Sequence, residues 1–99
     1  MKDLLNLKNN VAIVTGASSG IGYATALRLA EAGCHLVLAA RRVEKLKKLE
    51  TRIKKMGRKV IHIPTDVTKK EDITNLVKQT VKKFGRIDIL VNNAGILEF

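Results

Sequence analysis

A run of β-branched and other apolar residues near the start of the chain leads directly into a glycine-rich turn, and this feature limits the possible folds most strongly. Residues 11–15 read Val-Ala-Ile-Val-Thr, and residues 16–22 read Gly-Ala-Ser-Ser-Gly-Ile-Gly. Glycine has no Cβ atom, so the backbone at Gly16, Gly20 and Gly22 can turn sharply or approach a ligand closely. A helical pattern follows, and the first turn of a helix offers unpaired N–H groups that suit a phosphate. The sequence therefore predicts a strand, a phosphate-binding loop and the start of a helix.

Three strand–helix units followed by a fourth strand account for the hydrophobic pattern of the whole chain. Helices are indicated by apolar residues at 3.6-residue spacing, and strands by short continuous apolar runs, as in parallel strands that are covered on both faces. The expected elements are strands at 11–15, 36–40, 60–63 and 87–91 and helices at 22–33, 43–56 and 68–84.

These units predict an α/β fold with a Rossmann-like parallel sheet. Right-handed crossovers make consecutive strands parallel, and a reversal beside the first strand gives the spatial order 3-2-1-4, with helices on both faces. In such a partial doubly wound fold, ligands bind at the carboxyl ends of the strands. A chain of 99 residues, 45% of them hydrophobic and with no linker-like segment, is expected to be one domain spanning 1–99.

Several residues have plain structural interpretations. Thr68 and Glu71 have the spacing of a capping box at the start of the third helix. Cys34 precedes an apolar run and is expected to be a buried thiol, while His35 and His62 are expected to be packed or edge residues. Because no cysteine or histidine stands at metal-ligand spacing, no metal site is expected.

The net charge of +10 raises the question of nucleic-acid binding, but the distribution of charge argues against it. The basic residues alternate with apolar residues along the second and third predicted helices, as on solvated faces. Aromatic residues make up only 3% of the chain, so stacking platforms for single strands are missing. No stretch approaches the ~18 apolar residues of a membrane span. We therefore expect a cytoplasmic protein with no specific nucleic-acid partner and no membrane partner.

Two motifs at opposite ends of the chain resemble those of the short-chain dehydrogenase/reductase family. Residues 15–22 follow the spacing Thr-Gly-x-x-x-Gly-x-Gly, and residues 92–95 read Asn-Asn-Ala-Gly. The resemblance implies an oxidoreductase that transfers hydride between a nicotinamide dinucleotide and a carbonyl or alcohol substrate. The family's catalytic Tyr-x-x-x-Lys is absent, because Tyr23 is the only tyrosine and Leu27 stands where the lysine is needed. We therefore expect a cofactor-binding portion that is truncated after the fourth strand, has no catalytic residues and is inactive alone.

Chemistry and resemblance together predict the cofactor-binding residues. The backbone amides from Ser19 to Gly22 suit a pyrophosphate, and Ser18 can offer a hydroxyl towards the adenosine side. Asp66 and Val67 resemble the family's adenine pocket, and Asn92 begins a motif that would line the floor beneath the riboses. The two serines also fit ordinary loop or N-cap roles, and Asp66 also fits a loop that starts the next helix. The predicted set is Gly16, Ser18, Ser19, Gly20, Ile21, Gly22, Arg41, Arg42, Asp66, Val67, Asn92, Ala94 and Gly95.

The end of the second strand favours NADP(H) over NAD(H). In NAD-binding units an acidic residue roughly 20 positions past the glycine turn binds the ribose 2′-hydroxyl. Here Ala40 ends the strand, and Arg41 and Arg42 follow. An arginine fork suits a 2′-phosphate through charge-assisted hydrogen bonds, and similar family members with arginine in this place use NADP(H). We expect Arg41 to contribute first and Arg42 second, although Arg42 fits the solvated face of the next helix equally well.

Two other functions stay open from the sequence. One is a stand-alone dinucleotide-binding module without catalysis, and the other is a basic interaction protein on a Rossmann-like scaffold. The fourth strand would be an unpaired edge of Ile, Leu and Val, so we expect self-association through it. The full-length protein would act on a small-molecule carbonyl or alcohol, whose identity the sequence does not indicate.

Overall fold

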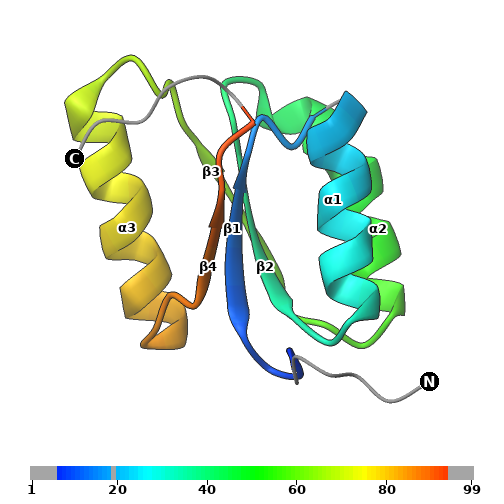
Figure 1. The fold of residues 1–99 in the computed structure, drawn as a ribbon. Helices are drawn as coiled ribbons and strands as arrows, with labels where there is room; N and C mark the ends of the chain where they lie inside the picture. The colour runs from blue at the N-terminus through cyan, green and yellow to red at the C-terminus, as the bar shows by residue number, and fades with distance from the viewer. Residues whose placement is uncertain (1–6, 19, 94–99) are drawn as a thin grey trace.

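A computed structural model describes residues 7–18 and 20–93, and it shows a parallel sheet between two layers of helices (Figure 1). The sheet order is β3-β2-β1-β4, and every neighbouring pair is parallel, which confirms the predicted topology. The elements in chain order are β1 (Val11–Thr15), α1 (Gly20–Glu31), β2 (His35–Ala40), the 3₁₀ helix η1 (Val43–Leu46), α2 (Lys47–Lys55), β3 (Val60–Pro64), α3 (Lys70–Phe84) and β4 (Ile89–Val91).

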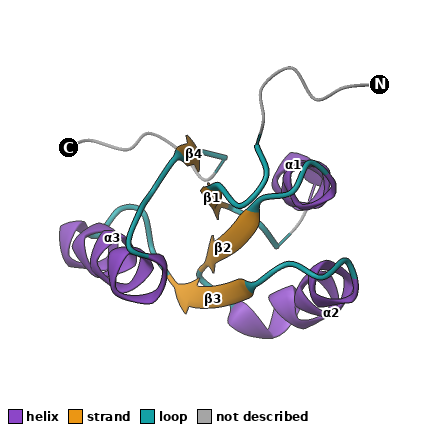
Figure 2. Ribbon diagram, turned by 90° about the horizontal axis from the view of Figure 1, so that it is seen from below, coloured by secondary structure: helices purple, strands orange, loops and turns teal. Residues whose placement is uncertain are grey.

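The sheet separates two hydrophobic clusters because successive side chains of a strand point to opposite faces. Helices α1 and α2 cover one face, where Val14 and Leu38 meet Leu49 in the larger cluster. Helix α3 covers the other face, where Ile13 and Leu76 belong to the smaller cluster (Figure 2). Both central strands are buried along nearly their full length, as their continuous apolar runs predict. Helices on both faces are therefore confirmed.

The expectation for Cys34 is also confirmed. Its side chain is fully buried, and Sγ lies 3.6 Å from the carbonyl oxygen of Leu7. Among the helices of the described residues, none is both long and apolar enough to cross a membrane.

The start of α3 differs from the predicted capping box. The helix begins at Lys70, and its N-cap residue Lys69 makes no capping hydrogen bond through its side chain. Thr68 is bonded elsewhere, since its hydroxyl donates to Asp66 Oδ1 at 2.6 Å and its amide donates to the same oxygen at 3.0 Å. The capping-box prediction was wrong because α3 begins at Lys70, so that Lys69 and not Thr68 occupies the N-cap position.

The start of β4 is two residues later than predicted because Asp88 replaces part of the backbone ladder with its side chain. The Val11 amide donates to Asp88 Oδ2 at 2.8 Å, and the Asp88 amide donates to the Val11 carbonyl at 2.9 Å. Arg86 donates to Asp88 Oδ1 at 2.7 Å, and this bond, together with that from Val11, holds the pKa of Asp88 below its ordinary value. The carboxylate thus fixes the register of β4 against β1.

The apolar face of α3 is wider than the part of that face that packs against the described strands. Leu76 and Thr80 are buried, whereas Val77 and Val81 are 36% and 47% exposed. Leu90 in β4 is also 41% exposed. Among the described strands, β4 pairs only with β1, so its outer edge carries unpaired backbone groups.

Self-association through this edge stays a prediction. We expect the protein to form dimers at micromolar to millimolar concentration, and Leu90→Lys to shift it toward monomer because a charge on an edge strand opposes pairing. Light scattering across a concentration series checks this. Val77→Lys on the neighbouring helix is the matched control, and an equal effect of both substitutions would point to the exposed apolar surface instead of the strand edge.

His35 makes the stability of this fold depend on pH. Its Nδ1 accepts a hydrogen bond from the Lys59 amide at 3.0 Å, and its ring stacks on Phe84 with centroids 6.0 Å apart. Burial, followed by the charges of Lys59 and Arg58, lowers the pKa of His35 below 6.5. Below pH 6.5 the unfolded chain therefore binds more protons at this site than the folded chain, and the folded state loses stability as pH falls.

We expect the free energy of unfolding to decrease as pH falls from 7.5 to 5.5, since a protonated Nδ1 cannot accept the Lys59 hydrogen bond. Urea unfolding at several pH values measures this decrease. His35→Asn retains a side-chain acceptor without titrating and should flatten the slope. An unchanged slope in His35→Asn would contradict the assignment.

Candidate cofactor-binding site

A cleft of about 790 Å³ lies where the carboxyl ends of β1, β2 and β3 meet. Three loops that are far apart in the sequence contribute to it, because the carboxyl ends of parallel strands lie at one edge of the sheet. Nine of the residues at its rim come from these loops or from a strand end, and Lys45 comes from η1. The lining is Gly16, Ser18, Ala40, Arg41, Arg42, Lys45, Thr65, Asp66, Val67 and Thr68.

The loop between β1 and α1 has a conformation that requires glycine. Gly16 and Gly20 have φ angles of 62° and 59°, in the left-handed region that other residues rarely adopt. Gly22 is buried in the first turn of α1, and a Cβ atom there would lie 2.1 Å from the Gly16 carbonyl oxygen. The start of α1 can therefore rest directly on the loop. Ile21 in the same turn is 75% exposed.

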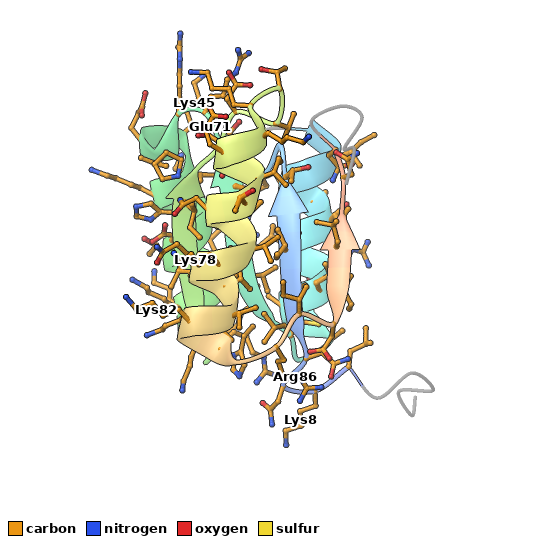
Figure 3. The ribbon with its side chains drawn as sticks, turned by 90° about the vertical axis from the view of Figure 1, so that its left-hand side faces the viewer. Lys8, Lys45, Glu71, Lys78, Lys82 and Arg86 are labelled. Atoms are coloured by element: carbon orange, nitrogen blue, oxygen red, sulfur yellow. The ribbon has the colours of Figure 1, made fainter. Side chains whose placement is uncertain are left out.

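Three cationic residues surround the part of the cleft that follows β2. Arg41 and Arg42 are both exposed at the cleft rim, and Ala40, only 6% exposed, ends the strand. Lys45 joins them, and Figure 3 shows it at the end of the molecule toward which the strands point. Asp66 is the only acidic residue among the described residues that line the cleft. This part of the cleft is thus suited to an anion.

The sequence-based reasoning missed Lys45, because the residue was counted in the solvated face of a helix. Its position three residues after Arg42 could have indicated this role. When a helix starts directly after a strand, the first turn of the helix stays beside the cleft at the strand end. The 3₁₀ geometry of residues 43–46 brings that turn there.

Asp66 is held firmly at the end of β3. Its Oδ1 accepts two hydrogen bonds from Thr68, and its own amide donates to Asp72 Oδ2 at 2.8 Å. The two bonds from Thr68, and to a smaller extent the charge of Arg41, hold the pKa of Asp66 below its ordinary value. The carboxylate therefore has the loop-ordering role that was one of its two interpretations, and it also lines the cleft beside Val67. Its contact with adenine stays a prediction.

A second polar group lies where β1 and β4 end, outside the residues that line the cleft. Thr15 is fully buried, and its hydroxyl lies 3.2 Å from Asn92 Oδ1, to which it can donate. The Asn93 amide donates to the same hydroxyl oxygen at 3.0 Å. Thr15 thus joins the two motifs, a role that its place in Thr-Gly-x-x-x-Gly-x-Gly could have suggested.

The structure brings together only part of the predicted set. Gly16, Ser18, Arg41, Arg42, Asp66 and Val67 line the cleft, while Gly20, Ile21 and Gly22 form the start of α1, and Asn92 sits at the end of β4. Ser19, Ala94 and Gly95 lie outside the described residues.

Comparison with known proteins identifies the fold and the family. A family profile described as short chain dehydrogenase matches residues 10–99. An uncharacterized oxidoreductase of Listeria monocytogenes is 54% identical over 93 residues, which cover 94% of this chain and 38% of that protein. The chain thus spans well under half the length of this relative.

Solved structures agree with this result. The L-sorbose reductase of Gluconobacter frateurii, complexed with NADPH and L-sorbose, is 41% identical with a TM-score of 0.84, and the match covers 90% of this chain and 34% of that one. A xylitol dehydrogenase with bound NAD⁺ is also 41% identical with a TM-score of 0.85, and the match covers 91% of this chain and 35% of that one. The family profile covers residues 10–99, and these residues include the parallel sheet and the glycine-rich loop. The chain therefore belongs to the short chain dehydrogenase family.

Proposed function

We propose that this chain binds NADP(H) in preference to NAD(H), with the 2′-phosphate held at the end of β2. The supporting observation is the placement of Arg41, Arg42 and Lys45 on one rim of the cleft, while the strand itself ends in the apolar Ala40. An aspartate at this end of the strand would accept hydrogen bonds from the ribose hydroxyls and repel a phosphate. Three cations without such a carboxylate favour a dianion.

The remaining residues fit the rest of a dinucleotide. The first turn of α1 offers the amides of Gly20, Ile21 and Gly22, and the absence of side chains at two of these positions permits close approach of a pyrophosphate. Gly16 and Ser18 line the same cleft as the arginines. Asp66, whose hydrogen bonds from Thr68 favour the charged form, would accept a hydrogen bond from the exocyclic amine of an adenine that packs beside Val67.

For the protein that carries this chain as its cofactor-binding portion, we propose an oxidoreductase that acts on a carbonyl or alcohol. A nicotinamide cofactor supplies the hydride chemistry when it is bound. The residues described here contribute binding and orientation: the glycine loop positions the phosphates, and the Thr15 and Asn92 pair fixes the neighbouring strand ends. This chain has no Tyr-x-x-x-Lys sequence, so we assign it no catalytic residue.

The test isolates the 2′-phosphate from the nicotinamide half of the cofactor. Calorimetric titration at near-physiological salt compares 2′,5′-ADP with 3′,5′-ADP. The second compound has the same charge but carries the phosphate on the neighbouring hydroxyl. NADPH is compared with NADH in parallel. We expect 2′,5′-ADP to bind at least about tenfold more tightly, as two added charge-assisted hydrogen bonds predict. Equal affinities for the two isomers, or tighter binding of NADH than of NADPH, would refute the assignment.

A further inference from the structure

A second cleft, of about 520 Å³, lies between α1 and α2, away from the residues that line the first. These helices lie side by side on the same face of the sheet (Figures 1 and 2). Tyr23 contributes from the first turns of α1, and all other lining residues belong to α2. They are Lys47, Lys48, Thr51, Arg52 and Lys55.

The spacing of these α2 residues places them on one face. At 3.6 residues per turn they fall within an arc of about 140° around the helix, and the distance from the first to the last is about 12 Å along its axis. The core residues Leu49 and Ile53 lie on another side. The acidic residue of α2, Glu50, is directed away from the cleft, because it contacts His62 of β3 and Lys54. The cleft therefore has four cations and no carboxylate among the described residues that line it.

None of these four cations takes part in an ion pair within the described part of the chain, where the pairs involve only Lys54, His62 and Arg86 as cations. Arg52 is nevertheless held in place. Its guanidinium carbon lies 5.9 Å from the centroid of the Tyr23 ring, and its Nη1 lies 3.4 Å from the Tyr23 hydroxyl. A guanidinium held by a ring and a hydroxyl keeps its remaining N–H groups available to an anion.

From this placement we propose that the cleft between α1 and α2 binds a short linear chain of phosphates. Such a chain carries charge on every unit and is narrow, so it can contact Lys48, Arg52 and Lys55 together within one cleft. The Arg52 fork suits phosphate oxygens, and the Tyr23 hydroxyl, which accepts a hydrogen bond from Arg52, adds an uncharged donor. A DNA duplex is much wider than a single chain of phosphates, so a cleft lined by two neighbouring helices favours the phosphate chain over nucleic acid.

Inorganic tripolyphosphate is the probe, titrated into the protein at about 150 mM salt so that general charge attraction is screened. Lys48→Gln/Arg52→Gln removes two charges from the cleft. Lys78→Gln/Lys82→Gln removes two charges from the exposed side of α3, on the opposite face of the sheet, and is the matched control (Figure 3). We expect about a tenfold loss of affinity in the first variant and a change below about twofold in the second.

A further control separates this cleft from the proposed cofactor site. Arg41→Ala should leave tripolyphosphate binding unchanged, and a loss in that variant would instead place the phosphate chain in the first cleft. NMR shifts of the Tyr23 and Thr51 amides in the unmodified protein give a readout that needs no variant. Absence of binding, an equal loss in both double variants, or tighter binding of duplex DNA than of tripolyphosphate would each overturn the proposal.

Discussion

Arg41→Ala is expected to weaken NADPH binding by about ten- to a hundredfold and to change NADH binding by less than about twofold. Hydrogen bonds to charged groups contribute about 1.5–3 kcal/mol each, and the lost bonds would be those to the 2′-phosphate. The side chain is exposed at the rim of the cleft, so its removal creates no cavity in the core. Calorimetric titration with both cofactors measures the two affinities separately.

The matched control is Arg28→Ala, which removes an exposed arginine from the last turn of α1. It should leave the ratio of NADPH to NADH affinity unchanged, because Arg28 does not line the cleft among the described residues. Lys45→Ala should lower NADPH affinity by a smaller factor, since a lysine makes a less directional contact than an arginine fork. If Arg41→Ala weakens both cofactors equally, the residue contacts a part that they share.

Gly22→Ala is expected to disrupt both the loop and the binding of the cofactor. A Cβ atom at this position would lie 2.1 Å from the Gly16 carbonyl oxygen and 2.8 Å from its carbonyl carbon. Because both are backbone atoms, the loop or the helix must move, which destabilises the fold by about 1–3 kcal/mol or more. For a domain of this size each 1 kcal/mol lowers Tm by about 4–8 °C. We expect NADPH affinity to fall by at least about tenfold in addition.

Gly57→Ala provides the comparison for Gly22→Ala. Gly57 has a φ angle of 81°, and an added Cβ atom there would meet nothing within 4 Å. Alanine at this position would be destabilised by about 1–2 kcal/mol because of the left-handed backbone conformation. It would collide with no neighbouring atom, and it lies far from the cleft. Thermal unfolding should therefore detect both substitutions, whereas cofactor titration should detect only Gly22→Ala. Normal NADPH affinity in Gly22→Ala would show that the loop can shift without affecting the ligand.

The two central strands illustrate what the sequence by itself determined. The predicted bounds of β1, 11–15, are those observed, and β2 starts only one residue earlier than predicted. In both cases apolar or β-branched residues run with little interruption between turn signals, so the local preference and the burial agree. The order 3-2-1-4 was predicted from right-handed crossovers together with a reversal beside the first strand, and it is the observed order. The positions of Arg41, Arg42 and Asp66 at one edge follow from the same topology.

The tertiary structure alone decided which groups meet at these strand ends. Asp88 accepts a hydrogen bond from the Val11 amide at a sequence separation of 77 residues, and the Asn93 amide donates to the Thr15 hydroxyl at a separation of 78 residues. Lys45, in the 3₁₀ turn that follows β2, lines the same cleft as Asp66, which follows β3. A sequence pattern shows which residues can donate, accept or carry charge. Which partner each group takes depends on the distances between segments that folding brings together, and periodicity along one chain does not encode those distances.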